Sequence, residues 1–160
     1  MQNNGKLFRS LMGRFVTGVT VIAASSKADV AAMTANAVSS VSVDPLILLC
    51  CIRNESSFLP VVLREGRFSV NVLSAGQDDI SRHYGGRRLN VCPADWALSA
   101  NAVPVLVGAN ASFVCHVDSH HRIGDHTVVY GAVDHMEALS QPSPALLYAS
   151  GSYIYLPLAA

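Results

Sequence analysis

The stretch that decides the fold is SFVCHVDSHHRIGDHTVVYGAVDHMEAL, residues 112–139. In its first part apolar and polar side chains alternate, with His116 on the polar side. This alternation predicts a β-strand that is buried on one face. The last part, from Thr127 onward, begins with an apolar run and predicts a second, buried strand. Gly124 and Asp125 have the residue types of a turn that opens this second strand.

Further strands are predicted on both sides of this region. LILLCCI (46–52) is apolar throughout, so we expect a strand that is covered on both faces. RFSVNVL (67–73) alternates and predicts a half-buried strand. Two more strands are predicted at VTVIAAS (19–25) and GSYIYL (151–156).

Helical patterns are few. Apolar side chains fall at helical spacing between Leu7 and Phe15, and we expect the face that they form to pack on the core. Two short helices are predicted, one in SSFLPVVLREG (56–66), which ends on a glycine cap, and one in QDDISRHYG (77–85). Because strands and helices do not alternate, the sequence predicts a mainly antiparallel β-barrel formed by a single domain, residues 1–160.

Composition restricts the classes of function. The chain has 51% hydrophobic and only 14% charged residues, whereas an average domain has about 25% charged residues. We expect a second copy to cover part of the apolar surface, which would make the protein a homodimer. The formal net charge of zero argues against nucleic acid as the main partner. No apolar run approaches the ~18 residues of a membrane span, and no signal peptide is seen, so a cytoplasmic protein is expected.

The cysteines show no Cys-x-x-Cys spacing. Cys50 and Cys51 are adjacent, so on a strand they point to opposite faces. We therefore expect free thiols in a reducing compartment. No serine or cysteine has an obvious base partner in the sequence, and no protein nucleophile is expected.

The segment AAMTANAVSSVSVDP (31–45) combines small side chains with hydroxyl and amide groups. Small residues would let a flat ligand lie against the backbone, whose N–H and C=O groups would then meet its polar edge. An edge strand rich in serine and threonine, facing solvent, explains the same pattern. No Gly-x-Gly-x-x-Gly or Walker motif occurs, so any nucleotide would be held by other means.

Two other segments are candidates for binding a phosphate. CCIRNESSF (50–58) ends a strand and opens a helix, whose free N–H groups suit an anion, although simple capping by Asn54 or Ser56 explains it as well. RHYGGRR (82–88) carries arginines on a glycine-rich loop, which would reach a phosphate or form a solvated charge cluster.

Histidines are concentrated in one region. His116, His120, His121 and His126 lie close together in the sequence, and histidine is the commonest metal ligand. No carboxylate or thiolate completes a known metal-binding spacing, so we expect no metal site. His126 follows Gly124 and Asp125 at the beginning of a strand, where it is either part of a simple turn or a placed titratable group.

Taken in order, seven segments resemble the flavin reductase-like family, the reductase components of two-component flavin monooxygenases. They are FVTGVTVIAA (15–24), MTANAVSSVSVDP (33–45), LILLCCI (46–52), SSF (56–58), FSVNVLSAGQDDIS (68–81), GDHTVVYGAV (124–133) and LLYASGSY (146–153). The resemblance runs from about Leu7 to Tyr155. The sequence departs from the family where DVAA precedes Met33 in place of the usual glycine-histidine pair, and where Leu46 replaces a frequent second proline.

The resemblance implies a homodimeric, Greek-key split β-barrel that reduces FMN or FAD with NADH or NADPH by hydride transfer from the nicotinamide C4 to flavin N5. It also implies a partner, a flavin-dependent monooxygenase that receives the reduced flavin. By position, the flavin-binding residues would be Thr34, Ala35, Asn36, Ala37, Ser39, Ser40, Cys51, Ile52, Ser56 and Ser57, to which we add Arg87 from the arginine loop. The nicotinamide-binding residues would be Gly124, Asp125, His126, Gly151 and Tyr153, with His126 as the candidate catalytic residue.

Three other functions are compatible with the sequence. A non-catalytic flavin-binding module would bind flavin without oxidising NADH or NADPH. A flavin-dependent oxygenase or oxidase would need its own organic substrate. A histidine-rich metal module would bind zinc or iron and no flavin.

Overall fold

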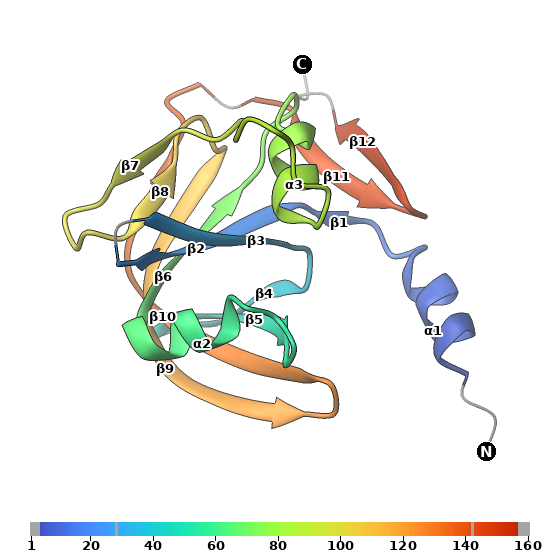
Figure 1. The fold of residues 1–160 in the computed structure, drawn as a ribbon, viewed down its shortest axis with the longest axis horizontal. Coiled ribbons are helices and arrows are strands. Elements are labelled where there is room, and N and C mark those ends of the chain that lie inside the picture. The colour runs from blue at the N-terminus through green and yellow to red at the C-terminus, as the bar shows by residue number, and fades with distance from the viewer. Residues whose placement is uncertain (1–3, 28, 142, 157–160) are drawn as a thin grey trace.

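The computed structural model describes residues 4–27, 29–141 and 143–156. The helices are α1 (Gly5–Met12), α2 (Leu59–Glu65) and α3 (Asp78–Tyr84). The strands are β1 (Thr17–Gly18), β2 (Thr20–Ser26), β3 (Asp29–Ala35), β4 (Val38–Val43), β5 (Leu46–Arg53), β6 (Arg67–Val72), β7 (Trp96–Leu98), β8 (Pro104–Leu106), β9 (Ala111–Ile123), β10 (His126–Ala138), β11 (Ala145–Ala149) and β12 (Ser152–Leu156). The expectation of a mainly β fold with a few short helices is confirmed (Figure 1).

One seven-stranded antiparallel sheet carries the fold, in the order β3-β2-β6-β9-β10-β5-β4. A three-stranded sheet, β1-β11-β12, and a β7–β8 pair complete the strands that the structure describes. The quoted stretch 112–139 forms the long β9–β10 hairpin at the centre of the large sheet, with Gly124 at its turn in a positive-φ conformation (φ 60°).

Strands β3 and β4 follow each other in the chain but form the two opposite edges of this sheet. Only Asn36 and Ala37 separate them, so this short connection passes from one edge to the other. The amide N–H of Cys51 on β5 donates to the carbonyl of Ala37 at 3.0 Å and fixes the connection. The two edges are therefore joined by the chain at Asn36–Ala37 without a β3–β4 ladder, and this open sheet fits a split barrel.

Strand β6 differs from its predicted half-buried state. Ser69 and Asn71, on the polar side of the alternation, are as fully buried as Phe68 on the apolar side. The backbone N–H of Leu106 on β8 donates to the Asn71 side chain at 3.0 Å, and Ser112 donates to the same oxygen at 2.9 Å. The polar face is thus covered by a second layer that satisfies its hydrogen bonds, so the prediction of a solvated face is wrong.

Strand β5 also differs in part. Its side chains toward the core, including Cys50 and Ile52, are completely buried. Alternate side chains on its other face, such as Leu49 and Cys51, are only half-buried. The prediction of full cover on both faces is therefore wrong for a single chain, because one face packs on the core while Cys51 lines an open cavity.

Helix α1 stands apart from the sheets in Figure 1 and buries no residue against the rest of the chain. Phe8 and Leu11 on its apolar face are 66% and 50% exposed. The expectation that this face packs on the core of the same chain is wrong. Helices α2 and α3 form as predicted, and α2 ends at Gly66, which takes the left-handed conformation of a C-cap.

None of the helices among the described residues has the length and apolar character that crossing a membrane requires.

Candidate functional site

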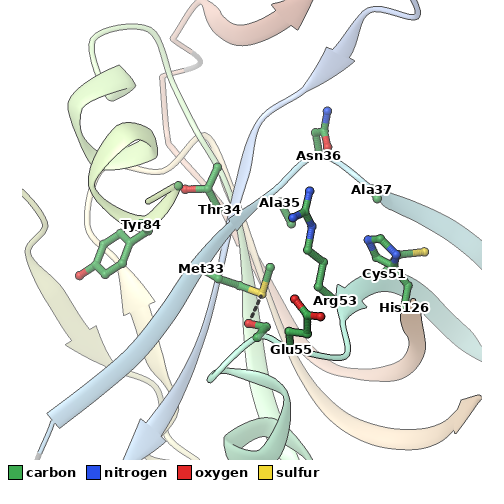
Figure 2. A pocket seen from close by; sticks show the side chains of 12 residues that line it. Met33, Thr34, Ala35, Asn36, Ala37, Cys51, Arg53, Glu55, Tyr84 and His126 are labelled. Carbon is green, nitrogen blue, oxygen red and sulfur yellow. Dashed lines mark hydrogen bonds between the residues drawn. The ribbon is translucent and has the colours of Figure 1, made fainter. Parts of the chain in front are cut away.

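A cavity of about 610 Å³ opens where β3 passes into β4 (Figure 2). Three of its lining residues come from β3 and two from the β3–β4 connection, and the others come from β5, the segment after it, the C-terminal end of α3 and β10. The lining residues are Met33, Thr34, Ala35, Asn36, Ala37, Cys51, Arg53, Glu55, Ser56, Tyr84, Gly85 and His126. The structure thus brings together segments that are distant in the sequence.

The wall formed by residues 34–37 has little side-chain bulk. The Thr34 hydroxyl donates to the backbone carbonyl of Ser81 at 2.6 Å, so this side chain is tied to α3. Ala35 is buried, whereas Asn36 and Ala37 are exposed. Because β3 and β4 are edge strands, their outer backbone groups have no ladder partner in the sheet. The carbonyls of Ala35 and Ala37 already accept hydrogen bonds from Thr20 and Cys51, so any backbone contact to a ligand here would come from the other groups of this edge.

Strand β5 contributes Cys51 and Arg53, and Figure 2 shows the Arg53 side chain reaching up toward Ala35. Burial raises the pKa of the Cys51 thiol. Burial raises the pKa of Cys50 and of Cys115, which lie in the core, to about 12. All four cysteines are free thiols, as expected, and these three remain protonated at neutral pH.

His126 lies at the mouth of the cavity, with Nδ1 2.8 Å from Oδ1 of Asp125. The hydrogen bond from His126, followed by the charge of His126, lowers the pKa of the Asp125 carboxyl. An ionised carboxylate only accepts hydrogen bonds, so Nδ1 carries the proton. In the neutral ring Nε2 is then an acceptor.

Asn54 holds the turn that carries this pair. Its side-chain amide donates to the carbonyl of Gly124 at 3.0 Å, and its backbone N–H donates to the carbonyl of Asp125 at 3.0 Å. Thr127 donates to the Asn54 side-chain oxygen at 2.8 Å. Asn54 therefore positions the β9–β10 turn, and the interpretation of Asn54 as a helix cap is wrong.

Tyr84 lines the opposite side of the cavity. Its hydroxyl accepts a hydrogen bond from Trp96 Nε1 at 3.2 Å and lies 3.2 Å from Sγ of Cys92. Burial, assisted by the contact with Cys92, raises the pKa of Tyr84 to about 12. The phenol is therefore a fixed, neutral group at physiological pH.

A second cavity, of about 480 Å³, adjoins the first at Gly85. It lies between the end of α3 and the β11–β12 hairpin. Its lining residues are Arg82, Gly85, Arg87, Tyr148, Gly151, Ser152, Tyr153 and Tyr155.

The two cavities divide the residues that the family resemblance suggests. Thr34 to Ala37, Cys51, Ser56 and His126 line the first cavity. Arg87, Gly151 and Tyr153 line the second and are not brought together with His126. Gly124 and Asp125 adjoin His126 without being among the lining residues of either cavity.

Four suggested residues lie elsewhere. Ile52 is completely buried in the core. Ser39 and Ser40 line a separate, largely apolar groove along β4, and Ser57 lines neither of the two cavities. In the isolated chain, the side chains of these four residues do not face the first cavity.

Five lining residues were not singled out from the sequence: Met33, Arg53, Glu55, Tyr84 and Gly85. Arg53 is the cross-strand partner of His126, a pairing that requires the β5–β10 register. Tyr84 and Gly85 reach the cavity only through the packing of α3 against β3. All five lie within the candidate segments 31–45, 50–58 and 82–88, but no local signal distinguishes them from their neighbours there.

The histidine-rich region forms no group of three or more potential metal ligands among the described residues. His116 Nδ1 lies 2.8 Å from Asp134, and Arg67 contacts the other oxygen of that carboxylate at 2.7 Å. His116 is thus part of an exposed ion-pair cluster on the outer face of the sheet.

The geometry defines a split barrel with an open cavity at the crossing of its two edges. The model of the flavin reductase-like domain family matches residues 12–157. The chain therefore belongs to the flavin reductase-like family. This confirms the resemblance that the sequence motifs suggested.

The chain is similar to characterised members of that family. It is 33% identical to the NADH-dependent FMN reductase SmoA of Agrobacterium fabrum, covering 94% of this chain and 85% of that protein. It is 33% identical to HsaB of Mycobacterium tuberculosis, the reductase subunit of a flavin-dependent monooxygenase, covering 92% of this chain and 80% of that protein. The solved structure of the flavin reductase PheA2 superposes with a TM-score of 0.90 at 33% identity, covering 99% of this chain and all of that chain. The expected enzyme class, an oxidoreductase of the flavin reductase type, is confirmed.

Proposed function

We propose that the protein uses NADH or NADPH to reduce FMN or FAD, and that the reduced flavin is passed to a partner monooxygenase. The observation that carries the proposal is the cavity at the β3–β4 crossing, which small residues of two edge strands line together with His126. The relatives support it, since one is named as an NADH-dependent FMN reductase and another as the reductase subunit of a flavin-dependent monooxygenase.

The residues of the first cavity fit a flavin. A volume of about 610 Å³ is within the usual range for ligand sites. The small side chains at 35 and 37 leave room for a flat ring, and the unpaired edges of β3 and β4 suit its polar rim. When bound, a flavin supplies the acceptor for a hydride donated by the nicotinamide.

The chain itself positions the two ligands. The backbone at Thr34–Ala37 would bind the polar edge of the flavin ring, and donors directed at that edge stabilise negative charge as it develops. Arg53 adds a positive charge on the same side of the cavity. His126, held by Asp125, would present Nε2 to the carboxamide of the nicotinamide and fix the ring over the flavin.

Protein nucleophiles have no part in this mechanism. The thiols of Cys50, Cys51 and Cys115 are protonated because burial raises their pKa values. A protonated thiol is a poor nucleophile. The difficult chemistry belongs to the two ligands, and the protein supplies orientation and electrostatics.

The experiment is to follow the near-ultraviolet absorbance of NADH and NADPH with the purified protein and added FMN, FAD or riboflavin. We expect sustained oxidation that requires added flavin and continues for many turnovers. A single turnover or none, despite tight flavin binding, would instead identify a flavin-binding module. Oxidation that required an organic substrate would identify an oxygenase.

We also propose that the protein acts as a homodimer. Apolar side chains of α1 are exposed, and an apolar groove of about 210 Å³ lies near Val43 and Met136, which are 85% and 55% exposed. Two apolar surfaces of this kind on a chain with 14% charged residues favour cover by a second copy. The free thiols support a further proposal, that the protein works in the reducing cytoplasm.

A further inference from the structure

The turn that follows β5 contacts two different parts of the molecule. The backbone N–H of Ser56 donates to the carbonyl of Arg53 at 3.0 Å and closes this turn. Arg53, Glu55 and Ser56 line the first cavity (Figure 2). Asn54, which lies between them in the chain, does not line it, and its side chain binds the β9–β10 turn instead. One short turn therefore contacts both the proposed flavin cavity and the hairpin that carries His126.

The tip of the β9–β10 hairpin extends past the end of β5. The last pair between β5 and β10 joins Arg53 to His126, so Gly124 and Asp125 lie beyond this ladder. A Cβ atom at Gly124 would meet no atom within 4 Å outside its chain neighbours, and the Asp125 side chain is 94% exposed. Packing therefore does not hold the tip. In the described part of the chain, Asn54 supplies the hydrogen bonds that join Gly124 and Asp125 to the β5 side.

The Asn54 amide has a single orientation that satisfies both of its neighbours. Its Nδ2 donates to the Gly124 carbonyl at 3.0 Å, and its Oδ1 accepts from the Thr127 hydroxyl at 2.8 Å. In a flipped amide, the side-chain oxygen would face the Gly124 carbonyl oxygen, and neither atom has a proton to donate. Thr127 is only 4% exposed, so its hydroxyl depends on this partner. Thr127 thus fixes the amide, and the amide fixes the turn.

The position of this turn matters for hydride transfer, because the two ligands would rest on different parts of the chain. The proposed function places the flavin on the cavity wall and the nicotinamide on His126. The reacting atoms must approach to about 3–3.5 Å, and a misplacement of ~1 Å can slow such a step about a hundredfold. Asn54 joins the two parts, since its backbone belongs to the turn beside the cavity and its side chain holds the hairpin tip.

We propose that Asn54 is a positioning residue for hydride transfer. It touches neither ligand and acts through His126, whose place at the cavity mouth and whose bond to Asp125 depend on the turn that Asn54 holds. The inference rests on the proposed function and adds to it the residue that sets the distance between the two reacting rings. Flavin binding itself does not depend on Asn54.

The first experiment compares Asn54→Ala with Asn110→Ala. Asn54→Ala keeps the backbone N–H bond to Asp125 and loses only the side-chain contacts, so the chain should fold. Asn110 is the matched control, because its side chain also joins distant segments, through hydrogen bonds to Ser143 and Pro144, and lines neither of the two cavities. With FMN as acceptor, we expect Asn54→Ala to raise the KM for NADH or to slow hydride transfer about three- to tenfold, the effect of one or two lost hydrogen bonds. Its FMN affinity should be unchanged, and Asn110→Ala should change neither quantity.

The second experiment tests whether Asn54 acts through His126. In a double-mutant cycle, Asn54→Ala should have no further effect on NADH kinetics once His126→Ala is present. Thr127→Val should cause a smaller loss in the same direction, because it frees the Asn54 amide, and Thr127→Ser, which keeps the hydroxyl, should behave like the unaltered chain. Additive effects of Asn54→Ala and His126→Ala would overturn the proposal. Unchanged NADH kinetics in Asn54→Ala, or an equal loss of FMN affinity, would overturn it as well.

A measurement without turnover separates this inference from the proposed function. In NMR spectra, the His126 ring should carry its proton on Nδ1, and the backbone N–H at position 54 should exchange slowly because it donates to Asp125. In Asn54→Ala, that N–H should exchange about tenfold faster or more, and the Nδ1-protonated form should decline. Unchanged exchange together with an unchanged ring would overturn the inference, whatever the kinetics. An unaltered chain that oxidises no NADH with any flavin would reject the proposed function and the role in hydride transfer, whereas the NMR result shows separately whether Asn54 holds the turn.

Discussion

At the scale of single residues, the hydrogen-bonded Asp125–His126 pair is the most closely defined part of the candidate site. Asn54 fixes the turn that carries the pair, because its side-chain amide donates to the carbonyl of Gly124 and its backbone N–H donates to the carbonyl of Asp125. The carboxylate fixes which ring nitrogen carries the proton, and the ring lies at the cavity mouth beside Cys51 (Figure 2). In the proposed function, a ring fixed in this way would position the nicotinamide, and no proton transfer by the ring would be required.

Replacing His126 with alanine should therefore affect nicotinamide use more than flavin binding. We expect the KM for NADH to rise, or hydride transfer to slow, by about tenfold or more, because one well-placed contact worth ~1.4 kcal/mol is lost. Steady-state kinetics measure the first quantity and stopped-flow absorbance the second, while flavin titration should show a much smaller change.

His120→Ala is the matched control, since His120 lies exposed on the same hairpin and does not line the cavity. Unchanged NADH kinetics in a folded His126→Ala protein would mean that this residue only begins a strand.

Part of the candidate site could be predicted from local sequence signals. Small residues at 34–37 and the Gly-Asp-His turn are local signals, and residues 34–37 and His126 of that turn line one cavity. Arg53 and Tyr84 could not be predicted, because they reach the cavity through strand register and helix packing, which depend on contacts between distant segments. Arg87 was associated with a phosphate, but its separation from His126 into another cavity is a property of the tertiary structure.

The β9–β10 hairpin dominates at the scale of elements, because it joins both halves of the seven-stranded sheet. Its register shifts between Tyr130 and Gly131. A Cβ atom at Gly131 would lie 2.5 Å from Cζ of Phe68 and 3.0 Å from Cβ of Cys115, both of which are completely buried. The core therefore has no space for a side chain at this position.

Gly131→Ala should destabilise the protein by about 1–3 kcal/mol, the usual effect of overpacking a well-filled core. Denaturant unfolding followed by circular dichroism measures this as a lower midpoint with an unchanged slope.

Gly18→Ala is the control, because a Cβ at Gly18 would have no atom within 4 Å outside its chain neighbours. Equal stabilities of the two variants would show that Phe68 and Cys115 can move aside.

Elements with a clear apolar or alternating pattern were predictable from the sequence. Strands β2, β5, β6, β9, β10 and β12 have apolar or alternating runs, whereas β1, β7 and β8 have only two or three residues and show no period. The apolar stripe of α1 predicted the helix, but the prediction that it packs on the core of the same chain is wrong. An amphipathic pattern shows that a helix has an apolar face, but it does not specify what packs against that face.

At the scale of the whole molecule, the main feature is the apolar surface that a single chain leaves exposed. α1 projects from the barrel, and Leu7 and Phe8 are 58% and 66% exposed. Single exposed apolar residues are ordinary, but a helix with an entire apolar face in solvent is not.

We therefore expect light scattering at micromolar concentration to give about twice the 17.0 kDa of one chain. Replacing Leu7 and Leu11 with glutamate should shift the protein toward the monomer, because burying an unpaired charged side chain in an apolar interface has a large free-energy cost.

The control replaces Arg9 and Ser10 with glutamate, on the polar side of the same helix. A mass near 17.0 kDa for the unaltered chain would reject the dimer.

The short connection at Asn36 and Ala37 has a consequence for the order of folding. It joins two hairpins, β2–β3 and β4–β5, each built from neighbouring strands that can pair early, within about 1–10 μs. Their attachment to opposite ends of the sheet requires β2 to pair with β6 and β5 with β10, which are distant in the sequence and therefore slow to find each other. A refolding chain would thus regain much of its secondary structure before the cavity exists, and capture of flavin would mark the last step of assembly.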